Sequence, residues 1–143
     1  MAVVMALDLG SKTIGIAVSD PSETFSFPGV TIQRQEGHRR DMAALREIIA
    51  DRGVEEIVIG MPLMMNGSRG IQAEKIEAFI EVLKRFVSLP IFTQDERLST
   101  SEVERMLISA DMKREKRKQV VDSLAASIIL QSYLDQKKSQ AAS

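Results

Sequence analysis

Residues 3–9 read VVMALDL, and this run constrains the fold more than any other feature of the chain. It is an apolar series with a single carboxylate, Asp8, inside it. A strand with one face in water alternates apolar and polar residues, whereas a strand buried on both faces is apolar nearly throughout. The run therefore predicts an inner strand of an α/β protein, with helices on both faces of its sheet.

The remaining elements follow in an order typical of this fold class. A turn at residues 10–13 and a strand at 14–19 complete a hairpin, which a third strand at 27–33 extends. Beyond them, short apolar runs alternate with apolar residues at helical spacing. The pattern predicts helices at 39–51, 71–87, 99–109 and 120–134, strands at 56–60 and 91–94, and a polar connector at 113–118.

Composition limits both the domain count and the available chemistry. The 143 residues, 44% hydrophobic and 27% charged, fit one domain, which we assign to residues 1–138, followed by a polar tail at 139–143. There are no cysteines and one histidine, His38. This excludes disulfides, a cysteine nucleophile and any metal site with two histidines from one chain.

Charge and hydropathy limit the partners and the compartment. The formal net charge is -1, so a nucleic acid would have to bind a local patch rather than a basic molecule. No apolar run approaches the roughly 18 residues that a membrane-spanning helix needs. With no membrane span, no export signal and no cysteines, we expect a cytoplasmic protein.

Asp8 is the first residue that suggests a functional site. A carboxylate inside an apolar strand loses hydration and must be compensated by hydrogen bonds, a cationic partner or a metal. The structural alternative is that Asp8 accepts hydrogen bonds from backbone amides of the turn that follows.

Two more acidic positions lie at the ends of predicted elements. Asp95 and Glu96 follow the strand at 91–94, and the carboxyl end of a strand is the usual rim of a site in α/β proteins. Alternation does not decide which of the two faces inward, and a solvated turn is an alternative. Asp122 begins the last helix, where the helix dipole favours an acid, but it also borders a packed face.

Carboxylates gathered in a neutral protein repel one another unless a cation lies between them. Oxygen ligands without histidine or cysteine suit Mg²⁺ or Mn²⁺. Such ions can activate water and stabilise a leaving oxygen in phosphodiester cleavage, without a nucleophilic side chain.

Basic residues offer contacts for a phosphate backbone. The turn GSKT lacks the spacing of a P-loop, but Lys12 can still serve it as a point charge. Residues 97–118 include seven basic and four acidic residues, among them the run KREKRK. Such runs are usually solvated connectors, although one beside a site could position a nucleic acid without reading its sequence.

Four motifs together resemble the YqgF/RuvX family. They are ALDLGSKTIGIAVSD at 6–20, IVIGMPLMMNGSRG at 57–70, DERLST at 95–100 and VVDSLAASIILQSYLD at 120–135. The resemblance implies a ribonuclease H-like α/β fold, with a five-stranded mixed sheet whose first three strands are antiparallel and whose other strands are parallel, and with helices on both faces. It also implies that Asp8, Glu96 and Asp122 are catalytic and hold Mg²⁺ or Mn²⁺.

The function implied is a metal-dependent endonuclease acting on structured nucleic acid. The substrate is either four-way (Holliday) junction DNA or the 5′ end of the 16S rRNA precursor. Lys12, Arg69 and Arg97 are our candidates for contacts to its backbone, and the loop at 60–70 for a flap over the site. Junction cutting needs two symmetric sites and hence a homodimer, whereas RNA trimming suits a monomer.

Two other functions remain open. A non-catalytic module that binds nucleic acid or ribosomes would show salt-sensitive binding that survives removal of metal. The LDLGSKT hairpin also resembles the phosphate loop of actin-like ATPases and sugar kinases, but a nucleotide-dependent phosphotransferase of that kind needs two domains.

Overall fold

The computed structural model describes residues 2–62, 70–96 and 114–141, with side chains described for all of these except 96, 114–122 and 141. Its strands are β1 (Val3–Leu9), β2 (Thr13–Ser19), β3 (Ser26–Gln33), β4 (Val54–Pro62) and β5 (Ile91–Glu96). Its helices are α1 (Arg39–Arg52), α2 (Ile71–Phe86) and α4 (Arg114–Ala141).

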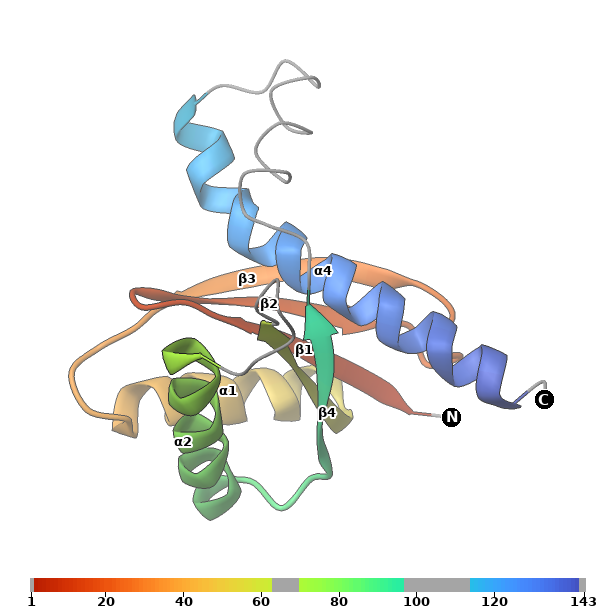
Figure 1. The fold of residues 1–143 in the computed structure, drawn as a ribbon, viewed down its shortest axis with the longest axis horizontal. Helices are drawn as coiled ribbons and strands as arrows, with labels where there is room; N and C mark the ends of the chain where they lie inside the picture. Colours follow the sequence, from red (N-terminus) through yellow and green to blue (C-terminus); the bar gives the residue numbers. More distant parts are fainter. Residues whose placement is uncertain (1, 63–69, 97–113, 142–143) are drawn as a thin grey trace.

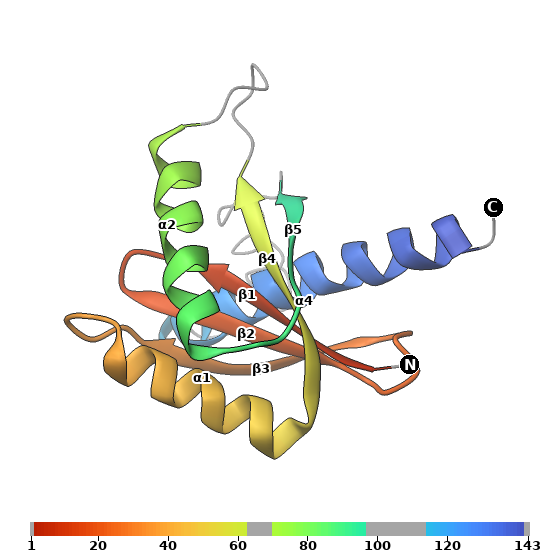
Figure 2. The same ribbon diagram turned by 90° about the horizontal axis from the view of Figure 1, so that it is seen from below.

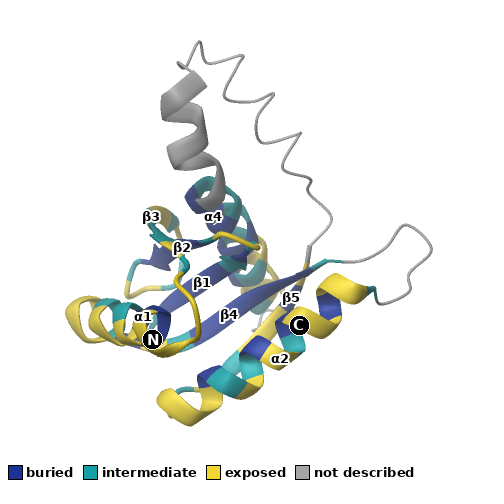
Figure 3. Cartoon of the chain, turned by 90° about the vertical axis from the view of Figure 1, so that its left-hand side faces the viewer, coloured by how far each residue is buried: buried dark blue, intermediate teal, exposed yellow. Residues whose placement is uncertain are grey.

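The strands form one five-stranded sheet in the order β3-β2-β1-β4-β5. β1 pairs with β2 and β2 with β3 in antiparallel fashion, whereas β4 runs parallel to both β1 and β5. This confirms the mixed sheet implied by the resemblance. β1 lies in the middle, as its apolar sequence predicted, and Figure 3 shows β1 and β4 as the buried centre of the molecule.

Helices cover both faces of the sheet (Figures 1 and 2). α4 crosses one face, and α1 and α2 lie on the other. The alternation of β1 divides its side chains between the two layers. Met5, Leu7 and Leu9 join the core under α1 and α2, and Val4 and Ala6 join the core under α4.

Small strand residues let α4 approach the sheet closely. Ala126, Ile129 and Leu130 are buried against a surface that includes Ala6 and Ala17, which are partners in the β1–β2 register. Burying one isoleucine or leucine side chain contributes about 1.5–3 kcal/mol, so this contact is a main attachment of the helix.

A polar network fixes the other end of α4. The Tyr133 hydroxyl donates to Glu56 over 2.7 Å, and Lys137 Nζ donates to Glu23 over 2.8 Å and to Glu56 over 3.1 Å. Burial, followed by the bond to Glu56, raises the pKa of Tyr133 above its ordinary range. Burial lowers the pKa of Lys137, but its bonds to the two carboxylates outweigh burial and raise it overall.

Several element ends differ from the sequence predictions. β4 is longer by two residues at each end than the strand predicted at 56–60, because residues up to Pro62 pair with β5. β5 continues through Asp95 and Glu96 instead of ending at residue 94, because both residues pair with β4, and this ladder outweighs their low strand propensity. α4 begins at Arg114 and ends at Ala141, so the connector predicted at 113–118 is wrong from residue 114 onward. Lysine, arginine and glutamate are good helix formers, and the packed turns that follow supply the helix nucleus.

The helix predicted at 99–109 lies outside the described residues. Within the described part of the chain, no helix combines the length and apolar character needed to cross a membrane.

Candidate functional site

Asp8 lies one residue before the end of β1, on the α4 side of the sheet, and its side chain is half-buried. Its partner on β2 is Gly15. On the other side Leu7 pairs with Ile59, so the next position of β4 is Gly60. Neither glycine carries a side chain, and both are buried in the sheet. A glycine inside a strand often marks the close approach of a ligand.

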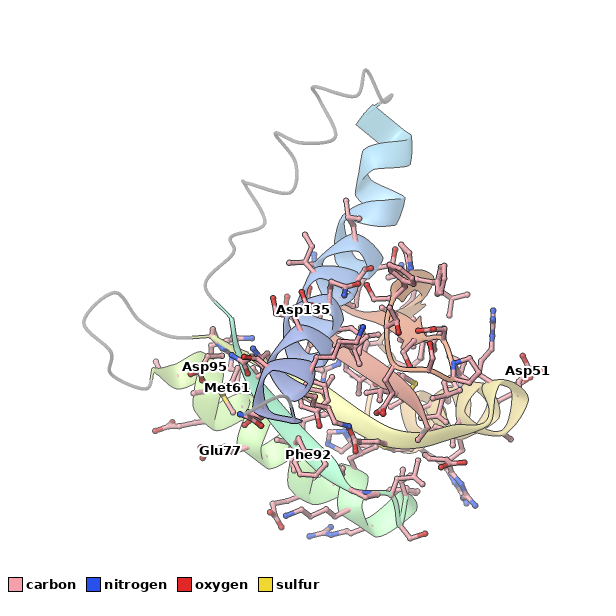
Figure 4. The ribbon with its side chains drawn as sticks, turned by 90° about the vertical axis from the view of Figure 1, so that its right-hand side faces the viewer. Asp51, Met61, Glu77, Phe92, Asp95 and Asp135 are labelled. Atoms are coloured by element: carbon pink, nitrogen blue, oxygen red, sulfur yellow. The ribbon has the colours of Figure 1, made fainter. Side chains whose placement is uncertain are left out.

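Glu96 is the last residue of β5 and pairs with Pro62, while its predecessor Asp95 pairs with Met61 (Figure 4 labels Asp95 and Met61). The side chain of Glu96 lies outside the described part of the structure. Gln94 is buried and Asp95 exposed. Since β5 includes the DE pair, strand alternation applies to it and assigns position 96 to the same face as Gln94.

Phe92 identifies that face. Its ring stacks on Tyr133 of α4 with centroids 6.2 Å apart, so positions 92, 94 and 96 belong to the α4 side of β5. Asp8 is on the same side of β1. β1 and β5 run in the same direction, so both acidic positions lie at the carboxyl end of the sheet.

Asp122 is in α4, and its side chain is also outside the described part. Its position in the helix precedes Ala126 by four residues and Ile129 by seven. Positions at these spacings lie on one face of a helix. Ala126 and Ile129 are both buried in the core between α4 and the sheet, which assigns position 122 to the sheet-facing side of α4.

Lys12 is exposed on the tight turn that joins β1 to β2. The Gly10 amide donates to the Thr13 carbonyl over 2.8 Å. A Cβ at residue 10 would lie 3.2 Å from that carbonyl oxygen, which explains the glycine.

Arg34 holds this turn from the end of β3. Its backbone amide donates to the Lys12 carbonyl over 2.9 Å, and its guanidinium donates to the Gly10 carbonyl over 2.6 Å. The same guanidinium approaches the buried carboxylate of Asp41 at 3.8 Å. Sequence analysis did not single out Arg34, because nothing distinguishes it within the polar stretch RQEGHRR.

Arg69, Arg97 and most of the predicted flap at 60–70 lie outside the described residues. The part of the chain with described side chains contains no group of three acids, histidines or cysteines able to hold a metal. This leaves the predicted trio untested, since two of its members, Glu96 and Asp122, have no described side chain.

Comparison with known proteins identifies the family. The family model described as "RuvX: Holliday junction resolvase" matches residues 2–136. The chain belongs to the RuvX family. One RuvX relative, the "Putative pre-16S rRNA nuclease" of Desulforamulus reducens, is 51% identical over 132 residues, which are 92% of this chain and 96% of that protein. A protein of the same description from Caldanaerobacter subterraneus is 48% identical over 136 residues, 94% of this chain and 97% of its own.

Solved structures confirm the fold of this RuvX chain. Thermus thermophilus RuvC in complex with a Holliday junction substrate superposes with a TM-score of 0.56, at 13% identity, over 95% of this chain and 96% of its own. A second structure of Thermus thermophilus RuvC gives a TM-score of 0.57 over 96% of each chain, also at 13% identity. At such low identity the likeness establishes the RuvC-like ribonuclease H fold and nothing finer.

Proposed function

We propose that this RuvX-family chain is a metal-dependent endonuclease that hydrolyses phosphodiester bonds in structured nucleic acid. The family description names Holliday junctions, and the relatives' descriptions name the 16S rRNA precursor. Cleavage of both substrates must therefore be measured side by side. Precursor rRNA is a cytoplasmic substrate in bacteria, so this function also supports the cytoplasmic location expected from the sequence.

The observation that carries the proposal is the common placement of three acidic positions. Asp8 in β1 and position 96 in β5 fall on the α4 side of the sheet at its carboxyl end. Position 122 falls on the sheet-facing side of the helix that covers this face. Two strand glycines, Gly15 and Gly60, flank Asp8 in the sheet, so no neighbouring strand side chain lies directly beside its carboxylate.

The donor set fits a hard divalent cation. Asp8, Glu96 and Asp122 would hold it through carboxylate oxygens, which Mg²⁺ and Mn²⁺ prefer. A bound ion of this kind supplies an activated water and stabilises the leaving oxygen in phosphodiester hydrolysis. The chain's own carboxylates would fix its position.

Basic residues around this end of the sheet would position the substrate. Lys12 is exposed on the β1–β2 turn, directly beyond the Asp8 strand end. We assign Arg69 and Arg97, which follow β4 and β5 in the sequence, to further contacts with the nucleic-acid backbone. The flap predicted at 60–70 can include only the part after residue 62, because residues 60–62 belong to β4. Backbone contacts of this type fix orientation without reading sequence.

The test compares cleavage of a four-way DNA junction, a linear duplex and a fragment spanning the 5′ end of 16S rRNA precursor, each with Mg²⁺, Mn²⁺ or EDTA. We expect one of the two structured substrates to be cut with metal and not with EDTA. Asp8→Asn should lower the rate at least about 100-fold, because it removes a charged ligand from the reacting centre. Cross-linking during the same assay would distinguish a homodimer on the junction from a monomer on RNA.

Asp51→Asn is the matched control, since Asp51 is an exposed aspartate at the far end of α1 (Figure 4). It should cut at the wild-type rate. Equal rates for Asp8→Asn and wild type would refute the assignment of Asp8. Salt-sensitive binding in EDTA, with no cutting of any substrate in metal, would instead establish the non-catalytic binding module.

A further inference from the structure

A groove opens on the face of the sheet opposite Asp8. It has a volume of about 630 Å³ and lies between the β1–β2 turn, the segment leading into α1, and α2. We call it the turn groove. Its lining includes Ser11, Arg34, His38, Gln72, Lys75 and Phe79.

The turn groove and the Asp8 site meet at one short piece of chain. Leu9 lines the groove, while its neighbour Asp8 lies on the other side of β1. Gly10 and Ser11, in the turn that carries Lys12, also line the groove. A polymer lying across Asp8 would enter the groove after passing over this turn.

The groove is suited to an anion. Arg34 and Lys75 bring positive charge and His38 a further nitrogen donor. Two acids lie nearby: Glu36 lines the groove, and the buried Asp41 carboxylate lies 3.8 Å from the Arg34 guanidinium. The Arg34 guanidinium is held in place by the Gly10 carbonyl and lies 5.8 Å from the centre of the Phe79 ring. A fixed guanidinium loses little conformational freedom when it binds phosphate, and its planar donors match phosphate oxygens.

The helix directions add to this preference. α1 and α2 both run back from the carboxyl end of the sheet, so both begin at the end where β1 finishes (Figure 2). His38 is the N-cap residue of α1 and makes no side-chain capping hydrogen bond. The positive end of the helix dipole favours negative groups at this end of α1, whose first turn already holds Asp41.

Part of the groove lining is apolar, and we call this part its floor; it consists of Leu9, Ala78, Phe79 and Val82. Cations beside an apolar floor match a nucleotide unit, with its phosphate on the cations and its base on the floor. The bases of a duplex are stacked and paired inside the helix and cannot reach such a floor. Single strands bind through this combination of charge and apolar contact.

We propose that the turn groove binds an unpaired strand of the nucleic-acid substrate next to the position of cleavage, with Arg34, His38 and Lys75 on its phosphates. This inference rests on the proposed function for the identity of the substrate. It assigns the strand a path over the β1–β2 turn, from the α4 side of the sheet to the α1 and α2 side.

The test measures binding of a short fluorescein-labelled single strand and of a duplex of the same sequence, by fluorescence anisotropy in EDTA at several salt concentrations. Lys75→Gln should weaken single-strand binding about 5-fold, the loss expected for one partly screened ionic contact. It should also lower the slope of log Kd against log salt by about 0.7, because one phosphate contact is lost. Duplex binding should change less than 2-fold, as is typical of a residue that the duplex does not touch.

Lys84→Gln is the matched control, because Lys84 is an exposed lysine of the same helix, pairs with Glu81 and does not line the groove. It should bind as wild type does. Ala78→Glu is a second probe at an exposed groove position and should also weaken the single strand selectively. Equal single-strand affinities for Lys75→Gln, Ala78→Glu and Lys84→Gln would overturn the proposal.

A competition arm separates a strand from a free nucleotide. Adenosine monophosphate should displace the labelled strand only weakly, because it offers one phosphate. Displacement at the concentration at which an unlabelled oligonucleotide acts would reveal a mononucleotide pocket and overturn the strand path. Since binding is measured without metal, a protein that cuts nothing but loses single-strand affinity in Lys75→Gln would refute the nuclease and keep the groove. Normal cleavage by the wild type, with single-strand affinity unaltered in Lys75→Gln, would keep the nuclease and refute the groove.

Discussion

Asp95 and Glu96 are consecutive acids with different places in the sheet. Asp95 is exposed, and its position in β5 alternates with that of the buried Gln94. Position 96 shares the alternation of Gln94 and Phe92, which belongs to the α4 side, where Asp8 lies. Successive residues of a strand belong to opposite faces of the sheet, so the two acids are not interchangeable.

We therefore expect Glu96→Gln to lower the cleavage rate at least about 100-fold, as a lost ligand would. Asp95→Asn should stay within about 3-fold of wild type, because an exposed charge near the site acts only through screened electrostatics. Initial rates on the substrate that the wild type cuts, at saturating metal, measure both. The reverse order of effects would transfer the assigned role to Asp95.

The sequence indicates those residues of the candidate site that differ from their local surroundings, and misses those whose role depends on contacts made only in the folded chain. Asp8 stands out because it is a charge inside an apolar run. The choice between Asp95 and Glu96 depends on how far β5 extends, which is set by pairing with β4 and not by local propensity. Arg34 reaches the Gly10 turn from 24 residues away, by a contact that only the folded sheet creates.

At the scale of elements, α4 is attached to the sheet in two ways. Its middle packs apolar side chains on β1, β2 and β4, and its later turns bind Glu23 and Glu56 through Tyr133 and Lys137. The inner place of β1 followed from its apolar run, and the strand directions from the resemblance to the family. The ends of α4 were not predicted correctly, because charged residues that resemble a connector also form helix readily once packed turns adjoin them.

We predict that Lys137→Met lowers the free energy of unfolding by about 1 kcal/mol, since it leaves Glu23 and Glu56 without their shared cation and since screening limits each pair. Lys138→Met, at an exposed neighbouring position, should change it little. Urea unfolding at low and high salt measures both, and the difference between the variants should shrink with salt. An equal loss in the two variants would contradict a specific role for the network.

The pH dependence of this attachment follows from the direction of the pKa shift. The pKa of Lys137 in the folded protein is raised above its ordinary value of 10.5. The stabilisation is therefore fully present below pH 10.5 and is lost as the pH rises through the folded-state pKa.

At the scale of the whole molecule, the proposed site would draw its acidic residues from three separate elements, β1, β5 and α4. Their mutual repulsion opposes folding unless a cation binds between them. Bound metal should thus stabilise the folded chain as a whole, apart from any catalysis.

We expect Mn²⁺ at about ten times its Kd to stabilise the protein by about 1.4 kcal/mol. In a chain of this size that raises the midpoint of thermal unfolding by about 5 °C relative to EDTA. Asp8→Asn should lose most of this increase, whereas Asp51→Asn should keep it. Calorimetry without nucleic acid measures it, and an unchanged increase in Asp8→Asn would show that any metal bound lies elsewhere.

The contacts between α4 and the beginning of the sheet join residues very far apart in sequence. Ser26 bonds to the Ser127 carbonyl across 101 residues, and Lys137 to Glu23 across 114. During synthesis on the ribosome, β1, β2 and β3 emerge long before α4 is made, and until then the apolar face holding Val4 and Ala6 has no cover. The proposed site, which includes Asp122 of α4, would therefore be complete only after α4 has left the exit tunnel.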